Sequence, residues 1–230
     1  MDIRGFLETS MLDWDGKISS VVFLSRCSFK CPFCHNYPLL FEPEKLKKFE
    51  VEEIKKYLAE HKNWIDAVVI SGGEPTVHQD LGKLIGEFKD MGFLVKLDTN
   101  GTNPAMLRSL MENIDYVAMD IKAPLNEKYD RLAGTSVDLE KIKESIRIIM
   151  GSGKKYEFRT TVVPGLLSLD DLKAMSGQIA GAMRFVIQQF EPGNCLDESL
   201  RDAKPYPKEK ILEMASAAKE FIPNTVVRGV

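Results

Sequence analysis

Short apolar runs rich in β-branched residues alternate along the chain with longer amphipathic stretches. The apolar runs predict strands, and the stretches between them, where apolar residues recur three or four positions apart, predict helices. The predicted strands are 18–25, 65–71, 93–98, 114–122, 156–163 and 184–190, and the predicted helices are 50–61, 79–91, 104–111, 138–150, 169–180 and 208–221. This alternation predicts an α/β fold with a parallel sheet, either an incomplete barrel or an open doubly wound sheet.

Composition and charge remove several classes of protein. The 230 residues suit one α/β domain with a large core. The net charge is -3 and no Lys/Arg-rich run is present, which disfavours a nucleic-acid partner. No apolar run approaches the roughly 18 residues that span a bilayer, so we expect no membrane partner. The N-terminal residues carry acids and no apolar segment, so we expect a cytoplasmic protein.

Unusual residues follow four of the predicted strands in turn. A cysteine cluster follows the first, "GGEP" (72–75) follows the second, "DTNG" (98–101) ends the third, and "DIK" (120–122) ends the fourth. The carboxyl ends of parallel strands meet at one edge, which is where α/β folds bind ligands. The four motifs therefore predict a single site at that edge.

The cysteine cluster contains three of the four cysteines of the chain, Cys27, Cys31 and Cys34. Clustered cysteines in a reducing compartment are more often metal ligands or redox groups than disulfides. A C-x3-C-x2-C run can place three sulfurs around a cubane iron–sulfur cluster. Because a cubane has four irons, three protein ligands leave one iron free to bind a small molecule.

Other uses of the same loop remain open on the sequence. "CPFCH" fits the attachment pattern of c-type haem, but that chemistry accompanies export and no signal peptide is seen. Zinc could be held by the three cysteines with His35, although adjacent Cys34 and His35 are awkwardly placed to bind one tetrahedral ion. A redox pair of Cys31 and Cys34 would leave Cys27 and the other motifs unexplained.

The motifs together resemble the radical S-adenosylmethionine superfamily. The resemblance rests on C-x3-C-x2-C with the aromatic Phe33 before the last cysteine, and on the strand-terminal "GGEP". It implies a partial (β/α)6 TIM-type barrel with parallel strands, one [4Fe-4S] cluster held by the three cysteines, and S-adenosylmethionine on the open iron. We expect a single domain over 1–230, with its motif-bearing core at about 16–193 and a C-terminal helix and tail at about 205–230.

Within that superfamily, "CPFCHN", "DTNG", "DIK" and "RTTVVPG" resemble the activating enzymes of glycyl radical enzymes. The resemblance assigns Gly72, Gly73 and Glu74 to the methionyl amino group of the cofactor. It also places Asp98 and Thr99 near the cofactor carboxylate, where a monovalent cation is held together with Asp120.

Charged residues of the fourth and fifth predicted strands complete the candidate site. Asp120 and Lys122 are two apart, so they face the same side of a strand, and the resemblance assigns them to the ribose and neighbouring atoms. An ordinary ion pair at the sheet edge is the alternative. The resemblance assigns Arg159 to a cofactor carboxylate or to the substrate, and a salt bridge to Glu157 or to a neighbouring strand is the alternative.

The sixth predicted strand departs from the pattern of some pyruvate formate-lyase activators. It ends in "QQFEPG" without the histidine found near that point. Gln188 or Gln189 could substitute, but the pattern does not say which of them faces inward. Cys195, in the loop that follows, is expected to be a passive residue.

The resemblance implies a reaction and its partners. A reduced cluster passes one electron to S-adenosylmethionine, and the resulting 5′-deoxyadenosyl radical abstracts hydrogen from a glycine of a glycyl radical enzyme under anaerobic conditions. A flavodoxin- or ferredoxin-like reductant is implied. The stretch 4–36 most resembles activators of anaerobic ribonucleoside-triphosphate reductase, and pyruvate formate-lyase or another glycyl radical enzyme is the alternative partner.

Two other classes of function stay open. One is a radical S-adenosylmethionine enzyme acting on a small molecule, a peptide or RNA, for which 7-carboxy-7-deazaguanine synthase is a compact example. The other is a non-catalytic metal or electron carrier, which would hold a cluster without cleaving S-adenosylmethionine.

Overall fold

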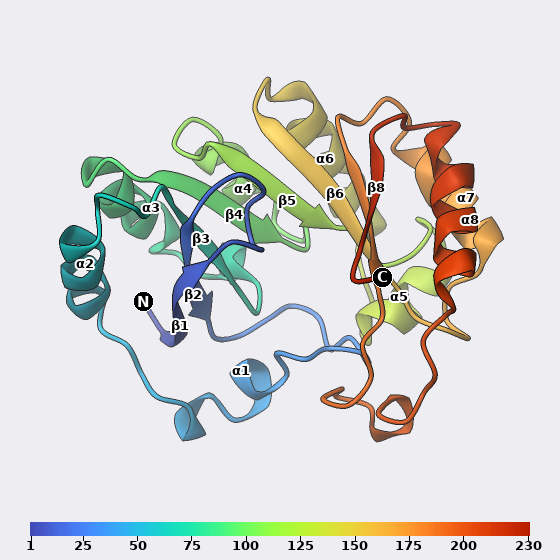
Figure 1. Cartoon of the computed structure of the whole chain (residues 1–230), viewed down its shortest axis with the longest axis horizontal. Coiled ribbons are helices and arrows are strands. Elements are labelled where there is room, and N and C mark those ends of the chain that lie inside the picture. The colour runs from blue at the N-terminus through green and yellow to red at the C-terminus, as the bar shows by residue number, and fades with distance from the viewer. The chain divides into compact units, whose positions relative to one another are not determined.

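The strands of the protein follow one another in a mostly parallel sheet. The computed structural model describes residues 1–230, and the strand order is β1 to β8 in chain order (Figure 1). Strand β1 is antiparallel to β2, whereas β2, β3 and β4 are parallel, as are β6, β7 and β8. The strands are β1 (Ile3–Ser10), β2 (Ser19–Leu24), β3 (Ala67–Gly72), β4 (Leu94–Thr99), β5 (Tyr116–Asp120), β6 (Lys155–Val162), β7 (Phe185–Gln189) and β8 (Thr225–Arg228). The predicted α/β class is confirmed.

Eight α-helices connect these strands, and several begin at residues suited to capping. Asn103 accepts a hydrogen bond from the backbone of Met106, and Ser168 forms a reciprocal capping box with Asp171. The helices are α1 (Pro38–Phe41), α2 (Val51–Glu60), α3 (Leu81–Asp90), α4 (Pro104–Leu110), α5 (Lys128–Ala133), α6 (Leu139–Gly151), α7 (Leu169–Gln178) and α8 (Lys208–Lys219), with 3-10 turns at Pro43–Lys45, Pro75–Val77 and Glu198–Leu200. All six predicted helices are confirmed.

The six predicted strands are also present, but β1 and β8 were not expected. Strand β1 contains a glycine and charged residues and has only β2 as a full partner, so its apolar signal is weak. Strand β8 is four residues long, too short for a periodic pattern. The predicted strand 114–122 was too long, because β5 ends at Asp120. Lys122 therefore lies beyond the strand.

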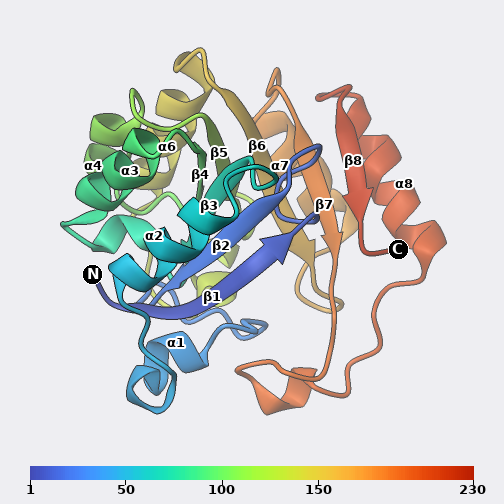
Figure 2. The same ribbon diagram turned by 60° about the vertical axis from the view of Figure 1, so that its left-hand side comes forward.

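Residue contacts divide the chain into two compact units. The first comprises 1–28 and 36–117, and the second comprises 29–35 and 118–230. In the first unit β1 runs along β2 (Figure 2), and the core contains Val21, Val69 and Leu97, which are inaccessible to solvent. In the second unit α7 and α8 lie side by side near β8, over a core that includes Phe158 and Val186 (Figure 1). None of the helices combines the length and apolar character needed to cross a bilayer.

Candidate active site

The paired glycines after β3 allow a close approach between two backbone segments of the first unit. Gly72 has φ +115°, and a Cβ there would lie 2.5 Å from the backbone of Leu24. A Cβ at Gly73 would lie 1.8 Å from the carbonyl oxygen of Arg26, so no larger residue fits without a backbone shift. Gly73 N donates to Leu24 O at 2.9 Å, and Glu74 N donates to Arg26 O at 2.8 Å. The glycines thus let the chain that leads into Cys27 run against the end of β3.

The carboxylate of Glu74 connects the loops after β3 and β4. Its side chain is buried, and Oε1 accepts hydrogen bonds from Thr76 N at 3.0 Å, Thr76 Oγ1 at 2.5 Å and Thr99 Oγ1 at 2.8 Å. Oε2 accepts from Asn100 N at 2.6 Å. Burial raises the pKa of Glu74, although these donors oppose the rise. Because both oxygens accept from neighbours inside the chain, Glu74 is placed to fix the two loops.

Asn100 connects this network to the first cysteine. Its Oδ1 accepts from Thr102 N at 3.0 Å and Thr102 Oγ1 at 2.8 Å, which directs the amide nitrogen the other way. That nitrogen lies 2.9 Å from Ser28 Oγ and 3.7 Å from Cys27 Sγ. The sequence suggested only a turn at Asn100. The sequence signal that could have identified Asn100 is its position: it is an amide side chain directly after a strand whose end is predicted to lie near the cysteine loop.

Asp98 and Thr99, the predicted cation residues, have different neighbours although they are adjacent. Asp98 Oδ1 lies 3.3 Å from Lys96 Nζ, and Asp98 Oδ2 accepts from Ser71 Oγ at 3.3 Å. Thr99 Oγ1 donates to Glu74 and accepts from Gly101 N at 3.1 Å. Lys96, whose side chain is 2% exposed, was not among the predicted site residues.

Three charged side chains of the second unit form an ion triad. Asp120 Oδ1 lies 2.8 Å from Arg159 Nε, and Asp120 Oδ2 lies 3.0 Å from Lys122 Nζ. Burial alone would raise the pKa of Asp120, but the cations of Arg159 and Lys122 lower it well below its usual range. The side chain of Asp120 remains 29% exposed. A ligand can therefore still reach this carboxylate.

The triad settles the local contacts that the sequence left open. Asp120 and Lys122 do form an ion pair, and Arg159 pairs with Asp120 of the neighbouring strand β5. Glu157 lies 3.6 Å from Arg184 Nε and 3.9 Å from Arg228. Ion pairing and ligand binding are compatible here, because a charged triad with partial exposure suits an anionic or polar ligand.

The thiols of the cysteine loop suit a thiolate-bound cluster. All four cysteines are free, and Cys34 N donates to Cys31 O at 3.0 Å, which folds Cys31 and Cys34 into one turn. Burial raises the pKa of the Cys31 thiol to about 11, partly offset by the Lys122 cation. An amide donor reaches Cys27 and a cation lies near Cys31, so the chain supplies the donors that stabilise bound thiolates.

The zinc alternative finds less support. That alternative requires His35 as the fourth ligand beside the three cysteines. His35 Nε2 lies 2.8 Å from the carbonyl oxygen of Glu191, so this nitrogen already has a partner.

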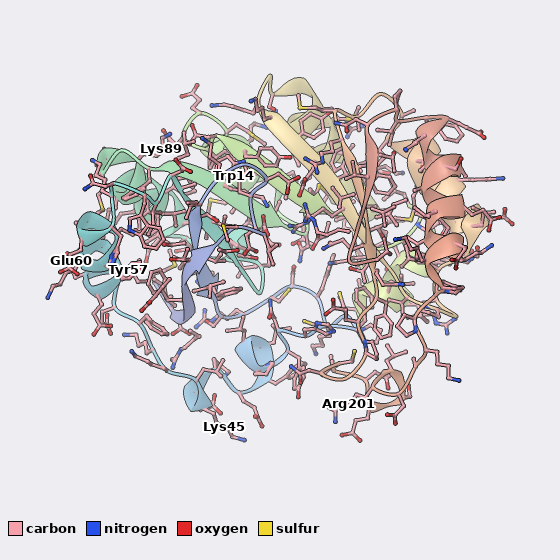
Figure 3. All side chains as sticks on the ribbon, in the orientation of Figure 1. Trp14, Lys45, Tyr57, Glu60, Lys89 and Arg201 are labelled. Carbon is pink, nitrogen blue, oxygen red and sulfur yellow. The ribbon has the colours of Figure 1, made fainter.

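The segment after β7 lies over the cysteine loop within the second unit. Asp197 N donates to Pro32 O at 2.8 Å, and Asn194 Nδ2 donates to His35 O at 3.2 Å. Arg201, labelled in Figure 3, donates from Nε to Cys195 O at 3.0 Å. Cys195 is buried, and its passive role stays a prediction. Gln189 donates to Tyr206 O at 2.6 Å, a contact the sequence did not reveal.

Comparisons with known proteins agree with the motifs. The model of the radical SAM superfamily matches residues 21–175. The chain is 39% identical to a Methanocaldococcus jannaschii protein assigned as a glycyl-radical enzyme activating enzyme, over 99% of this chain and 96% of that protein. It is 25% identical to the pyruvate formate-lyase-activating enzyme of Clostridium pasteurianum, over 96% of this chain and 98% of that one.

A solved structure supports the fold. The chain matches the crystal structure of Streptococcus suis SuiB with a TM-score of 0.71 and 16% identity, over 91% of this chain and 48% of that one. It thus spans about half the length of that protein, and the likeness bears on the fold alone.

The family and its cofactors follow from the matched residues and the full-length relative together. Radical SAM proteins use a [4Fe-4S] cluster and S-adenosylmethionine, and the cysteine loop provides suitable thiols. The chain belongs to the radical SAM superfamily and is an enzyme of its glycyl-radical enzyme activating type.

Proposed function

We propose that this enzyme generates a glycyl radical on a partner protein, most directly an anaerobic ribonucleoside-triphosphate reductase. The observation that carries the proposal is the 39% identity to the M. jannaschii relative, which extends over 99% of this chain. The stretch "RGFLETSMLDWDGKISSVVFLSRCSFKCPFCHN" (4–36) resembles the activators of anaerobic ribonucleotide reductase, which favours the reductase as partner. Pyruvate formate-lyase is the second candidate, favoured by the full-length likeness to the Clostridium pasteurianum activator.

The cysteine loop would hold the cluster through Cys27, Cys31 and Cys34. When bound and reduced, the cluster supplies the electron that cleaves S-adenosylmethionine to methionine and a 5′-deoxyadenosyl radical. Asn100 would donate to the Cys27 sulfur, and Lys122 would offset the charge of the Cys31 thiolate. Both contacts stabilise charge on the ligand sulfurs. The electron requires a flavodoxin- or ferredoxin-like reductant.

The residues that the resemblance assigns to S-adenosylmethionine each have a distinct role in its binding. Gly72 and Gly73 would offer backbone atoms to its amino group, with Glu74 holding their loop. Asp98 and Thr99 would lie on the cofactor carboxylate side. Asp120, Lys122 and Arg159 would orient the ribose and carboxylate, since the triad is charged and partly exposed. With the cofactor bound, these residues would fix the direction in which hydrogen is abstracted.

Electron paramagnetic resonance tests the proposal. Anaerobic enzyme is incubated with reductant, S-adenosylmethionine and each candidate partner, whose glycines carry deuterium at Cα. We expect a glycyl doublet with the true partner and deuterium in 5′-deoxyadenosine, because direct abstraction transfers the label. A partner with the radical glycine changed to alanine is the matched control and should give neither signal.

The same experiment distinguishes the alternatives. Abundant 5′-deoxyadenosine without transferred deuterium, and without a glycyl signal for any partner, would contradict the proposal and favour a small-molecule, peptide or RNA substrate. A bound cluster with no cleavage of S-adenosylmethionine would favour an electron carrier.

A further inference from the structure

Lys96 is a buried cation in the interior of the first unit. Its side chain on β4 is 2% exposed, and its ammonium lies 3.3 Å from Asp98 Oδ1. The ammonium also donates to the carbonyl oxygen of Asp13 and lies 5.7 Å from the centre of the Tyr116 ring. Burying an ammonium is costly unless anions, dipoles or rings surround it. A carboxylate, a carbonyl and an aromatic ring surround the Lys96 ammonium, so this site is suited to a buried positive charge.

The hairpin between β1 and β2 helps to hold this position. Asp13 Oδ2 accepts from Ser10 Oγ at 2.5 Å, which fixes the turn that presents the Asp13 carbonyl. Trp14 lies on the same hairpin (Figure 3), with its ring 5.5 Å from that of Tyr116. The turn and its aromatic contact therefore keep water away from the ammonium.

The partner of Lys96 lies at the ligand-binding edge. Asp98 is one residue from the end of β4 and is 8% exposed. Its Oδ2 accepts from Ser71, the residue before the glycine pair. Asp98 thus connects the Lys96 ammonium to Ser71, next to the loop that would hold the cofactor.

We propose that Lys96 is the resident cation of the Asp98 site and a positioning residue for S-adenosylmethionine. Its ammonium pairs with Asp98 Oδ1 at 3.3 Å and holds this side chain in place, where a monovalent ion would otherwise be required. Thr99 directs its hydroxyl to Glu74, and a second cation beside Asp98 would be repelled by the ammonium. Cofactor binding by this chain is therefore independent of Na⁺ and K⁺, which departs from the cation that the sequence suggested.

The inference rests on the proposed cofactor site, but its test needs no partner enzyme. Binding of S-adenosylmethionine to the anaerobic, cluster-loaded protein is measured at constant ionic strength in NaCl, KCl or tetramethylammonium chloride. We expect the wild-type affinity to agree within about twofold in all three salts, because the charge is built into the chain. An affinity several-fold higher in KCl or NaCl than in tetramethylammonium chloride would overturn the inference.

Variants at Lys96 sharpen the test. Lys96→Met keeps the length of the side chain and removes the charge, so affinity should fall on the order of tenfold and K⁺ or Na⁺ should restore part of it. Lys96→Arg should retain the wild-type pattern. Lys89→Met is the matched control, because Lys89 pairs with Asp115 at 2.7 Å in the same unit but is 33% exposed.

Folding and cofactor effects can be separated. Iron content and melting temperature are measured for each variant. A Lys96→Met protein with native melting temperature and unchanged affinity in all salts would contradict the inference. If Lys96→Met does not fold, the wild-type salt comparison and Lys96→Arg decide the question. Absence of a glycyl radical with every partner would bear on the proposed function alone.

Discussion

Two carboxylates, the buried Glu74 of the first unit and the half-buried Asp120 of the second, occupy opposite electrostatic environments. Glu74 accepts hydrogen bonds only from hydroxyl and backbone groups of Thr76, Thr99 and Asn100, and burial raises its pKa. Burial also tends to raise the pKa of Asp120, but two neighbouring cations outweigh this effect and lower the pKa. Neutral donors hold a carboxylate in place, whereas cations keep it charged.

The difference in exposure matches the difference in charge. Glu74 is inaccessible to solvent, while the Asp120 side chain is 29% exposed. Glu74 is therefore suited to fixing backbone, and Asp120 to contacting a ligand. Substitution at Glu74 should affect stability first, and substitution in the triad should affect cofactor affinity first.

The largest effect is expected in the cysteine loop, where the chain passes from one unit to the other. Replacing Cys27, Cys31 or Cys34 by alanine should abolish cluster binding, because each thiolate holds a separate iron. Iron analysis of anaerobically reconstituted protein should give about four irons per chain for wild type. Cys195→Ala is the control and should keep the cluster. Loss of the cluster in Cys195→Ala would contradict the assignment of three ligands with one open iron.

The second effect is loss of cofactor affinity in the triad. Asp120→Asn or Lys122→Met should weaken S-adenosylmethionine binding roughly tenfold or more, since hydrogen bonds to charged groups contribute about 1.5–3 kcal/mol. Iron content and melting temperature should change little, because the side chains of Lys122 and Arg159 are each partly exposed, at 15% and 12%. Lys128→Met, which removes a more exposed cation from an ion pair with Asp171, is the control. A large fall in melting temperature with unchanged affinity would show that the triad is structural.

Periodicity predicted most of the fold, because buried parallel strands have continuous apolar runs. Strands such as β3 and β4 were found from those runs, with ends within two residues. Strands β1 and β8 were missed because local sequence identifies them poorly. Strand β1 mixes apolar, polar and charged residues, and β8 has only four residues. Their pairing partners are not visible in a local window.

The sequence identified most residues of the candidate site, but it did not reveal which of them contact one another. Spacing identified the cysteines and placed Asp120 and Lys122 together, and the structure shows their ion pair. The pairing of Arg159 with Asp120 depends on which strands are neighbours. Asn100 and Lys96 were missed because their importance comes from tertiary partners, Cys27 and Asp98 respectively.

The third effect concerns stability and its pH dependence at Glu74. A raised carboxyl pKa means that the folded state binds more protons than the unfolded state above the ordinary pKa, so stability falls as pH rises from about 5 towards the folded pKa. Glu74→Gln should remove that slope. It should also lower stability by about 1–3 kcal/mol, because the amide leaves some donors without an acceptor.

Melting temperatures between about pH 5 and pH 8 test this expectation. Asp120→Asn is the comparison, since a lowered pKa keeps Asp120 ionised throughout that range and its contribution is lost only on further acidification. The Asp120→Asn profile should therefore run parallel to wild type. Parallel profiles for wild type and Glu74→Gln would contradict the role given to Glu74.

The smallest effect is expected at Asn100, where the first unit contacts a cluster ligand. Its amide nitrogen is shared between Ser28 Oγ at 2.9 Å and Cys27 Sγ at 3.7 Å. Hydrogen bonds to ligand sulfurs raise the reduction potential of an iron–sulfur cluster because they stabilise the added negative charge. Asn100→Ala should therefore lower the potential while iron content is unchanged. Ser28→Ala removes the competing acceptor and should raise it. Redox titration followed by electron paramagnetic resonance measures both, and shifts of the same sign would show that the Asn100 amide does not act through the Cys27 sulfur.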